Sequence, residues 1–108
     1  YELTEELRCA GYAAKPIVGR CGANISLYNR REDLVAETDG RFDDRDAIYQ
    51  ELFRLPQVEG RNVQIQAFAV AGAYAGAGAR VDPSLIITTD SDLLPLRVLP
   101  DEEFLAGC

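Results

Sequence analysis

Apolar and polar positions alternate in short segments that are separated by glycine, proline and charged residues. The segment AIYQELFRL, residues 47 to 55, has a period of two along its whole length, which is typical of a strand, and it stops at Pro56. The same reasoning predicts further strands over residues 12 to 18, 24 to 28, 63 to 71 and 79 to 89, the last one bent at Pro83. Strands joined by short turns favour an antiparallel sheet over a parallel α/β arrangement.

Helices are predicted to be few and short. Residues 3 to 9 form the first, with Thr4 as the N-cap and Gly11 as the stop. Brief helices are also expected over residues 32 to 37 and 101 to 105. The stretch AGAYAGAGA, residues 71 to 79, has small side chains that permit close backbone approach or loop motion. We therefore expect an α+β fold, mainly antiparallel sheet with short helices.

Length and composition limit the domain number and the class of protein. A chain of 108 residues with 47% hydrophobic residues can bury one core, so residues 1–108 are expected to form one domain. The chain begins with Tyr1 rather than Met, and we expect it to be a fragment of a longer polypeptide. No apolar run reaches the length of about 18 residues that a membrane span needs, and the acidic start does not resemble a secretory signal. A cytoplasmic location is expected.

Charge and cysteine content exclude several kinds of site. A net charge of -7 argues against a nucleic-acid-binding or membrane-binding surface, because both need a broad basic face. Cys9, Cys21 and Cys108 are widely spaced, and the chain has no histidine, so neither a zinc pattern nor a disulfide framework is indicated. We expect reduced thiols. Residues 8 to 31 are nevertheless basic and contain no acid, which suits a compact anion such as a nucleotide, although charge scatter in a short chain gives the same pattern.

The candidate chemistry lies in KPIVGRCGANI, residues 15 to 25, which begins with the only lysine of the chain. A strand lysine beside a glycine-rich turn can place an ammonium among phosphate oxygens while backbone N–H groups of the turn bind the same anion. Gly19 and Gly22 would allow close approach. The order differs from a Walker A loop, because Lys15 precedes the glycines. By spacing alone, a surface lysine before an ordinary hairpin turn is the favoured interpretation.

Four segments, in order and at matching intervals, resemble the C-terminal part of the glutathionylspermidine synthase family of ATP-grasp ligases. They are GYAAKPIVGRCGANISL, IYQELFRLP, VQIQAFAVAGAYAG and RVDPSLI, and the resemblance runs from about Arg8 to Val98. It implies that residues 1–108 are the C-terminal nucleotide-binding portion of an ATP-grasp fold. It also implies an ATP- and magnesium-dependent ligase that joins a carboxylate to an amine through an acyl phosphate. In the family's namesake these are the carboxylate of glutathione and an amine of spermidine.

The resemblance also assigns roles to residues of this chain. Lys15 matches a lysine that contacts ATP phosphates, and Arg80 matches an arginine near the transferring phosphoryl group, a catalytic position. The phosphate-covering loop is matched by Gly19, Arg20, Cys21, Gly22, Ala23 and Asn24. The hinge beside adenine is matched by Tyr49, Gln50, Glu51 and Leu52.

Other interpretations remain open at this stage. Arg80 could pair with Asp82 or Asp90 at a strand end, and lysines of the family are replaced here by Thr88 and Thr89. Family metal ligands are expected upstream, and none is assigned in this chain. The segment Asp90-Ser91-Asp92 resembles the metal motif of glycosyltransferases, which is frequent by chance. The rival functions are a non-catalytic nucleotide-binding or interaction module and, less favoured, a glycosyltransferase fragment. The isolated chain is not expected to be active alone.

Overall fold

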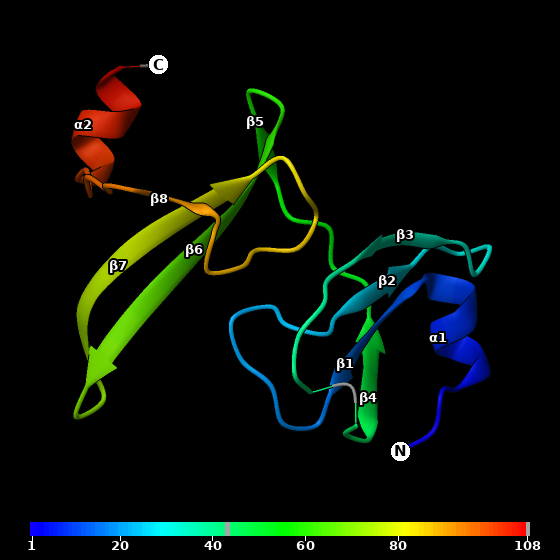
Figure 1. The fold of residues 1–108 in the computed structure, drawn as a ribbon. Helices are drawn as coiled ribbons and strands as arrows, with labels where there is room; N and C mark the ends of the chain where they lie inside the picture. Colours follow the sequence, from blue (N-terminus) through cyan, green and yellow to red (C-terminus); the bar gives the residue numbers. More distant parts are fainter. Residues whose placement is uncertain (43, 108) are drawn as a thin grey trace.

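The computed structural model describes residues 1–42 and 44–107 and contains two four-stranded antiparallel sheets with two short helices (Figure 1). The first sheet has the strand order β3-β2-β1-β4. Its strands are β1 (Tyr12–Pro16), β2 (Ser26–Tyr28), β3 (Leu34–Glu37) and β4 (Ala47–Glu51). The second sheet has the order β5-β6-β7-β8. Its strands are β5 (Gln57–Val58), β6 (Arg61–Val70), β7 (Ala73–Asp82) and β8 (Asp92–Leu94). The predicted α+β class with antiparallel sheets is confirmed.

Helix α1 (Glu5–Ala10) begins and ends at the predicted signals. The Leu7 N–H donates to the Thr4 hydroxyl at 3.3 Å, so Thr4 is the N-cap. Gly11 ends the helix with a φ of 90°, a conformation that favours glycine. Helix α2 (Asp101–Ala106) confirms the predicted C-terminal helix. Neither helix, in the part of the chain that the structure describes, is long and apolar enough to span a membrane.

Three sequence predictions are wrong. The strand expected over residues 47 to 55 ends at Glu51, well before Pro56. Residues 32 to 37 do not form a helix: Glu32 turns the chain with a φ of 62°, and Leu34–Glu37 then pairs with β2 as an edge strand. The strand expected over 79 to 89 ends at Asp82 instead, because Pro83 has no N–H with which to continue the ladder. The Gly/Ala-rich stretch, residues 71 to 79, lies in the β6–β7 turn and in β7 itself, which pairs with β6 along its full length. This hairpin extends away from the first sheet (Figure 1).

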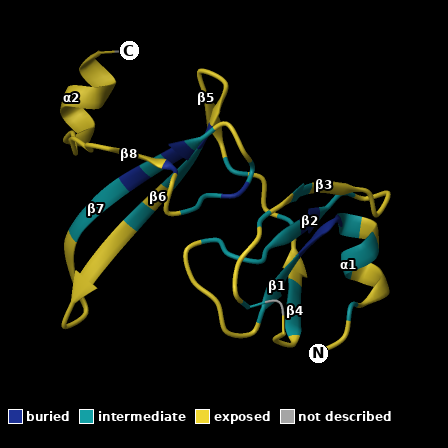
Figure 2. Cartoon of the chain, in the orientation of Figure 1, coloured by how far each residue is buried: buried dark blue, intermediate teal, exposed yellow. Residues whose placement is uncertain are grey.

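The buried core joins the two halves of the chain. Ala13 of β1 and Leu27 of β2 pack with Ile86, which lies in the loop between β7 and β8. Figure 2 shows this loop with a buried segment beside the first sheet. The loop of the second sheet thus supplies an apolar side chain to the core of the first sheet, and this contact fixes residues 86 to 89 next to the loop that follows Lys15.

Candidate functional site

Lys15 lies on β1 opposite Ile48 and lines a cavity of about 320 Å³ with the glycine loop, defined as residues 19 to 24. All of this loop except Asn24 contributes to the lining, with Pro16, Ile17, Ile25 and Ile48. Among the ion pairs of the described residues, none includes Lys15. The described contacts therefore leave its ammonium group without an ionic partner.

The glycine loop is fixed at its C-terminal end and leaves donors free in its middle. The Asn24 side-chain oxygen accepts from the Phe42 N–H at 2.8 Å, and the Thr38 hydroxyl donates to the Gly22 carbonyl. Cys21 and Gly22 have φ values of 56° and 71°. Within the described residues, the backbone N–H groups of Arg20, Cys21 and Gly22 have no hydrogen-bond acceptor. Consecutive free N–H groups in a left-handed turn are typical of an anion-binding concavity.

Arg80 lies on β7, and its guanidinium donates to the Thr88 carbonyl at 3.1 Å. It does not pair with Asp82 or Asp90 among the described contacts. Asp82 instead accepts from the Ser91 hydroxyl at 2.7 Å and from the Ser84 N–H at 2.8 Å, and these bonds lower the pKa of Asp82. The strand-end pairing considered for Arg80 is therefore not the arrangement in this structure.

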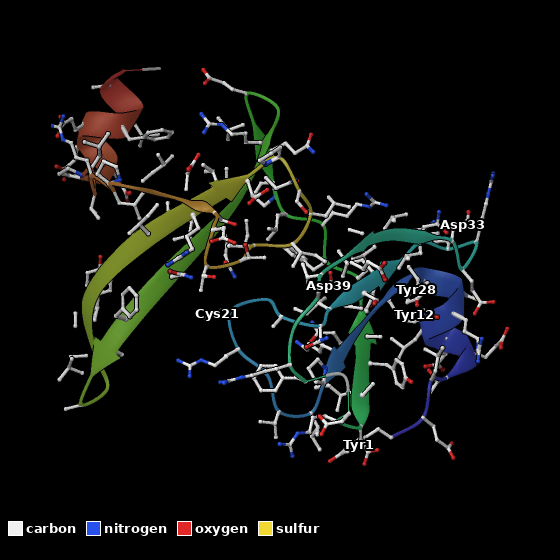
Figure 3. All side chains as sticks on the ribbon, viewed as in Figure 1. Tyr1, Tyr12, Cys21, Tyr28, Asp33 and Asp39 are labelled. Carbon is white, nitrogen blue, oxygen red and sulfur yellow. The ribbon has the colours of Figure 1, made fainter. Side chains whose placement is uncertain are left out.

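The glycine loop connects the Lys15 cavity to a second one that contains Arg80. This second cavity, of about 250 Å³, is lined by Cys21, Gln66, Arg80, Ile87, Thr88 and Thr89. Cys21 lines both cavities, and Figure 3 shows it on the loop between the two sheets. A Cβ atom on Gly22 would lie 2.2 Å from the Ile87 carbonyl oxygen, so only glycine allows this close approach. The fold therefore brings Arg80 next to the glycine loop that follows Lys15, although Arg80 lies far from both in sequence.

Asn62 supports this arrangement and was missed by the sequence analysis. It is 1% exposed, and its amide donates to the Ser84 carbonyl at 2.8 Å and more weakly to those of Asp82 and Pro83. Asn62 therefore fixes the turn that leads from Arg80 to Ile86. A polar residue paired with Asp82 beside Pro83 is the only sequence signal, and it is a weak one.

The predicted hinge residues lie elsewhere. Tyr49, Gln50 and Glu51 belong to β4, an edge strand, and the Leu52 N–H donates to the Gly11 carbonyl at 3.0 Å. None of the four lines the cavities of Lys15 or Arg80; Ile48 is the β4 residue that does. The outer edge of β4 nevertheless presents backbone groups without a neighbouring strand, as contact with an adenine edge requires.

The remaining candidates are engaged in structural contacts. Ser91 bonds Asp82, and Asp92 lies 3.6 Å from the Arg61 guanidinium, so the Asp90–Asp92 segment is part of the turn into β8. Among the described residues, no group of three or more acids and cysteines could hold a metal ion. Residues 1–42 and 44–107 therefore do not fit a magnesium site. Cys9 and Cys21 are free thiols, whereas Cys108 lies outside the described residues.

Comparison of the sequence with known proteins assigns the chain to a family. The family model described as glutathionylspermidine synthase preATP-grasp matches residues 2–99. The chain belongs to this family. The resemblance to the glutathionylspermidine synthase family is thereby confirmed. The position within the synthetase is corrected: preATP-grasp denotes the N-terminal part that precedes the ATP-grasp, so the assignment to the C-terminal part is wrong.

Similar curated proteins are synthetases and a ligase. The chain is 43% identical over 99 residues to the bifunctional glutathionylspermidine synthetase/amidase of Escherichia coli, an alignment that covers 92% of this chain and 16% of that protein. It is 44% identical over 98 residues to trypanothione synthetase of Crithidia fasciculata, covering 91% of this chain and 15% of that protein. A putative acid–amine ligase of Haemophilus influenzae is 27% identical over 105 residues, with 93% and 26% covered. The chain therefore spans about a sixth of the first two relatives.

Proposed function

We propose that this chain contributes a phosphate-binding element to an ATP-dependent carboxylate–amine ligase. The whole protein would phosphorylate a carboxylate with ATP and pass the acyl group to an amine. Membership in a family of synthetases supports the reaction class. Glutathione and spermidine are the proposed substrates, because the Escherichia coli relative is a glutathionylspermidine synthetase/amidase.

One observation supports the phosphate-binding role above all others. The glycine loop, with free N–H groups at Arg20, Cys21 and Gly22, lies between the cavity of Lys15 and the cavity of Arg80. A triphosphate needs several donors and cations in a row, and this arrangement supplies both kinds. Fixed donors of this type stabilise charge that moves during phosphoryl transfer without having to reorganise.

The three features would have different roles. Lys15 and the loop N–H groups would bind phosphates that are already charged in the ground state, so they act mainly on affinity. Arg80, held by the Thr88 carbonyl, would contact the phosphoryl group in transfer and act mainly on rate. The outer edge of β4, residues Tyr49 to Leu52, would contact adenine through backbone groups. Magnesium would be held by residues outside the part of the chain that the structure describes.

The test uses the natural polypeptide that contains this sequence, supplied with ATP, glutathione and spermidine. The acyl-phosphate route predicts release of ADP and phosphate rather than AMP and pyrophosphate. Lys15→Met keeps the aliphatic stem and removes the charge, so ATP affinity should fall by about tenfold or more. Arg97→Gln removes one positive charge from an exposed ion pair with Glu103, remote in sequence from the site, and serves as the control.

The outcomes separate the rival functions. ADP release with a new amide product supports the ligase. ATP binding that depends on Lys15 but produces no ADP with any acid and amine supports a non-catalytic nucleotide-binding module. ATP affinity that is the same in Lys15→Met and Arg97→Gln would refute the phosphate-binding role.

A further inference from the structure

A third cavity, of about 500 Å³, shares no lining residue with the two cavities of the candidate site. Arg30 and Arg31 line it from the turn between β2 and β3, and Arg54 lines it from the segment after β4. Asn29, Asp33 and Glu51 add polar groups, while Ala10 and Leu52 add apolar surface. The cavity is thus built from three segments that the first sheet brings together.

Among the described residues, the three arginines of this cavity form no ion pair, whereas Arg8 of helix α1 forms one. Arg8 donates to the Glu32 carboxylate at 2.6 Å, and this bond raises the pKa of Arg8. Among the described residues, the side chains of Arg30, Arg31 and Arg54 form no ion pair or hydrogen bond. The three guanidinium groups outnumber the two carboxylates of the cavity lining, Asp33 and Glu51, although the chain as a whole has a net charge of -7.

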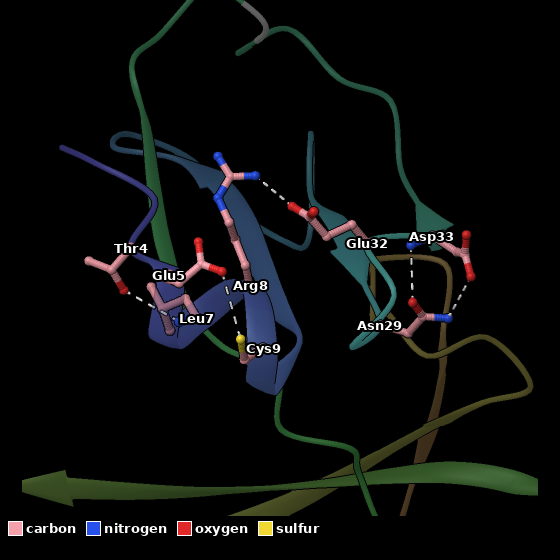
Figure 4. Close-up of polar contacts among 8 residues, drawn as sticks. All are labelled: Thr4, Glu5, Leu7, Arg8, Cys9, Asn29, Glu32 and Asp33. Carbon is pink, nitrogen blue, oxygen red and sulfur yellow. Dashed lines mark hydrogen bonds and ion pairs between the residues drawn. The ribbon is translucent and has the colours of Figure 1, made fainter.

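The turn that presents two of these arginines is rigidly built. The Asn29 side-chain oxygen accepts from the N–H groups of Arg31 at 2.8 Å and Asp33 at 3.0 Å. The Asn29 amide donates to the Asp33 carboxylate at 3.3 Å (Figure 4). The Glu32 N–H also donates to the Asn29 carbonyl at 3.0 Å. These bonds hold the backbone that carries Arg30 and Arg31, and among the described contacts the Asp33 carboxylate bonds Asn29 rather than an arginine.

We propose that this cavity is a separate binding site for a compact polyanion, of the polyphosphate or polycarboxylate class. Guanidinium forks bind both kinds of group through paired hydrogen bonds. The volume suits a small ligand, and no aromatic side chain lines the cavity to stack on a nucleobase. Glu51 disfavours a ligand that extends its charge along β4, so the bound anion is short.

The site is tested by calorimetric titration of the natural polypeptide with pyrophosphate and, separately, with citrate. Titrations are made in the Lys15→Met background, so that phosphate binding at the glycine loop is weakened and the remaining binding is compared between variants that share it. Arg54→Gln should weaken binding by about tenfold or more, since one charge-assisted contact is lost. Arg97→Gln in the same background is the matched control and should change nothing. Binding should also weaken as salt is added, because the arginines are exposed.

Each result decides between alternatives. Saturable binding that Arg54→Gln weakens and Arg97→Gln leaves intact supports the site, and the stronger of the two anions identifies phosphate or carboxylate as the preferred group. The site is overturned if Lys15→Met and its two derivatives, Arg54→Gln and Arg97→Gln, bind equally well. It is also overturned if neither pyrophosphate nor citrate binds. Arg31→Gln is a second variant in case Arg54→Gln fails to fold, as judged by circular dichroism. Failure here leaves the glycine-loop proposal untouched, because the two sites share no residue.

Discussion

Replacement of Gly22 by alanine tests whether the contact between the glycine loop and Ile87 organises the candidate site. The change introduces a Cβ atom 2.2 Å from the Ile87 carbonyl oxygen, a distance at which one of the two backbones must move. An ordinary contact needs the loop to withdraw by roughly 1 Å. The φ of 71° at Gly22 adds a strain of about 1–2 kcal/mol for any L side chain.

The matched control is Gly72→Ala in the turn between β6 and β7. Gly72 has a φ of 81°, but a Cβ atom there meets nothing within 4 Å, so this variant carries the backbone strain without the collision. Gly72→Ala should therefore lower the free energy of unfolding by about 1–2 kcal/mol and leave turnover unchanged. Gly22→Ala should cost more stability than this and lower turnover by about 100-fold, the loss that a 1 Å misplacement of catalytic groups can cause.

Two assays on the natural polypeptide separate the structural claim from the functional one. Urea denaturation measures the stability of both variants, and steady-state ADP release measures turnover. If the two variants are equally destabilised, the packing of the loop against Ile87 does not hold in solution. If Gly22→Ala is the more destabilised but releases ADP at the normal rate, the packing is real and the proposed phosphate-binding role is wrong.

Three further predictions concern residues around the site. Arg80→Ala should lower kcat by about 100-fold with little change in ATP affinity, compared by ADP release and calorimetry; loss of ATP binding instead would make Arg80 a ground-state anchor. Asn62→Ala leaves the carbonyl of Ser84 without its buried donor, so urea denaturation should show that the free energy of unfolding falls by about 1–3 kcal/mol. A fall below about 0.5 kcal/mol, the usual size for surface substitutions, would contradict the supporting role of Asn62. The fold lowers the pKa of Asp82, so the stability that Asp82 contributes is complete above its unfolded pKa, near 4, and is lost as the pH falls through its folded pKa. Ser91→Ala removes the hydrogen bond to Asp82 and should reduce this loss of stability in acid. If the urea midpoints of the variant and the natural protein change equally below about pH 5, the coupling is refuted.

Local signals predicted the parts of the fold that depend on neighbouring residues. Thr4 and Gly11 mark the ends of α1 because a cap needs only the adjacent turn. Residues 34 to 37 carried no such signal: four residues are too few to show a period, and their conformation is decided by pairing with β2. The Gly/Ala-rich stretch of β7 also offered no pattern of side chains, and its partner β6 determines it.

The candidate site divides in the same way. The motif around Lys15 predicted an anion-binding loop, and the structure places this loop beside a cavity. The bond between Arg80 and Thr88, and the contact of Gly22 with Ile87, depend on packing between distant segments and could not be read from spacing. The hinge residues Tyr49 to Leu52 stay predictions, because their role needs a nucleotide and the rest of the cleft.

The position of Ile86 in the core also governs the order in which the chain can fold. Ala13 and Leu27 leave the ribosome early, but their apolar partner follows only after the β6–β7 hairpin has been synthesised. The first sheet cannot complete its core until then, and contacts between such distant residues slow folding. A nascent chain stopped after Asp82 would carry all four strands of the first sheet but lack Ile86, so Ala13 and Leu27 would be less covered than in the finished fold. Apolar surface exposed in this way favours aggregation and chaperone binding until Ile86 is added.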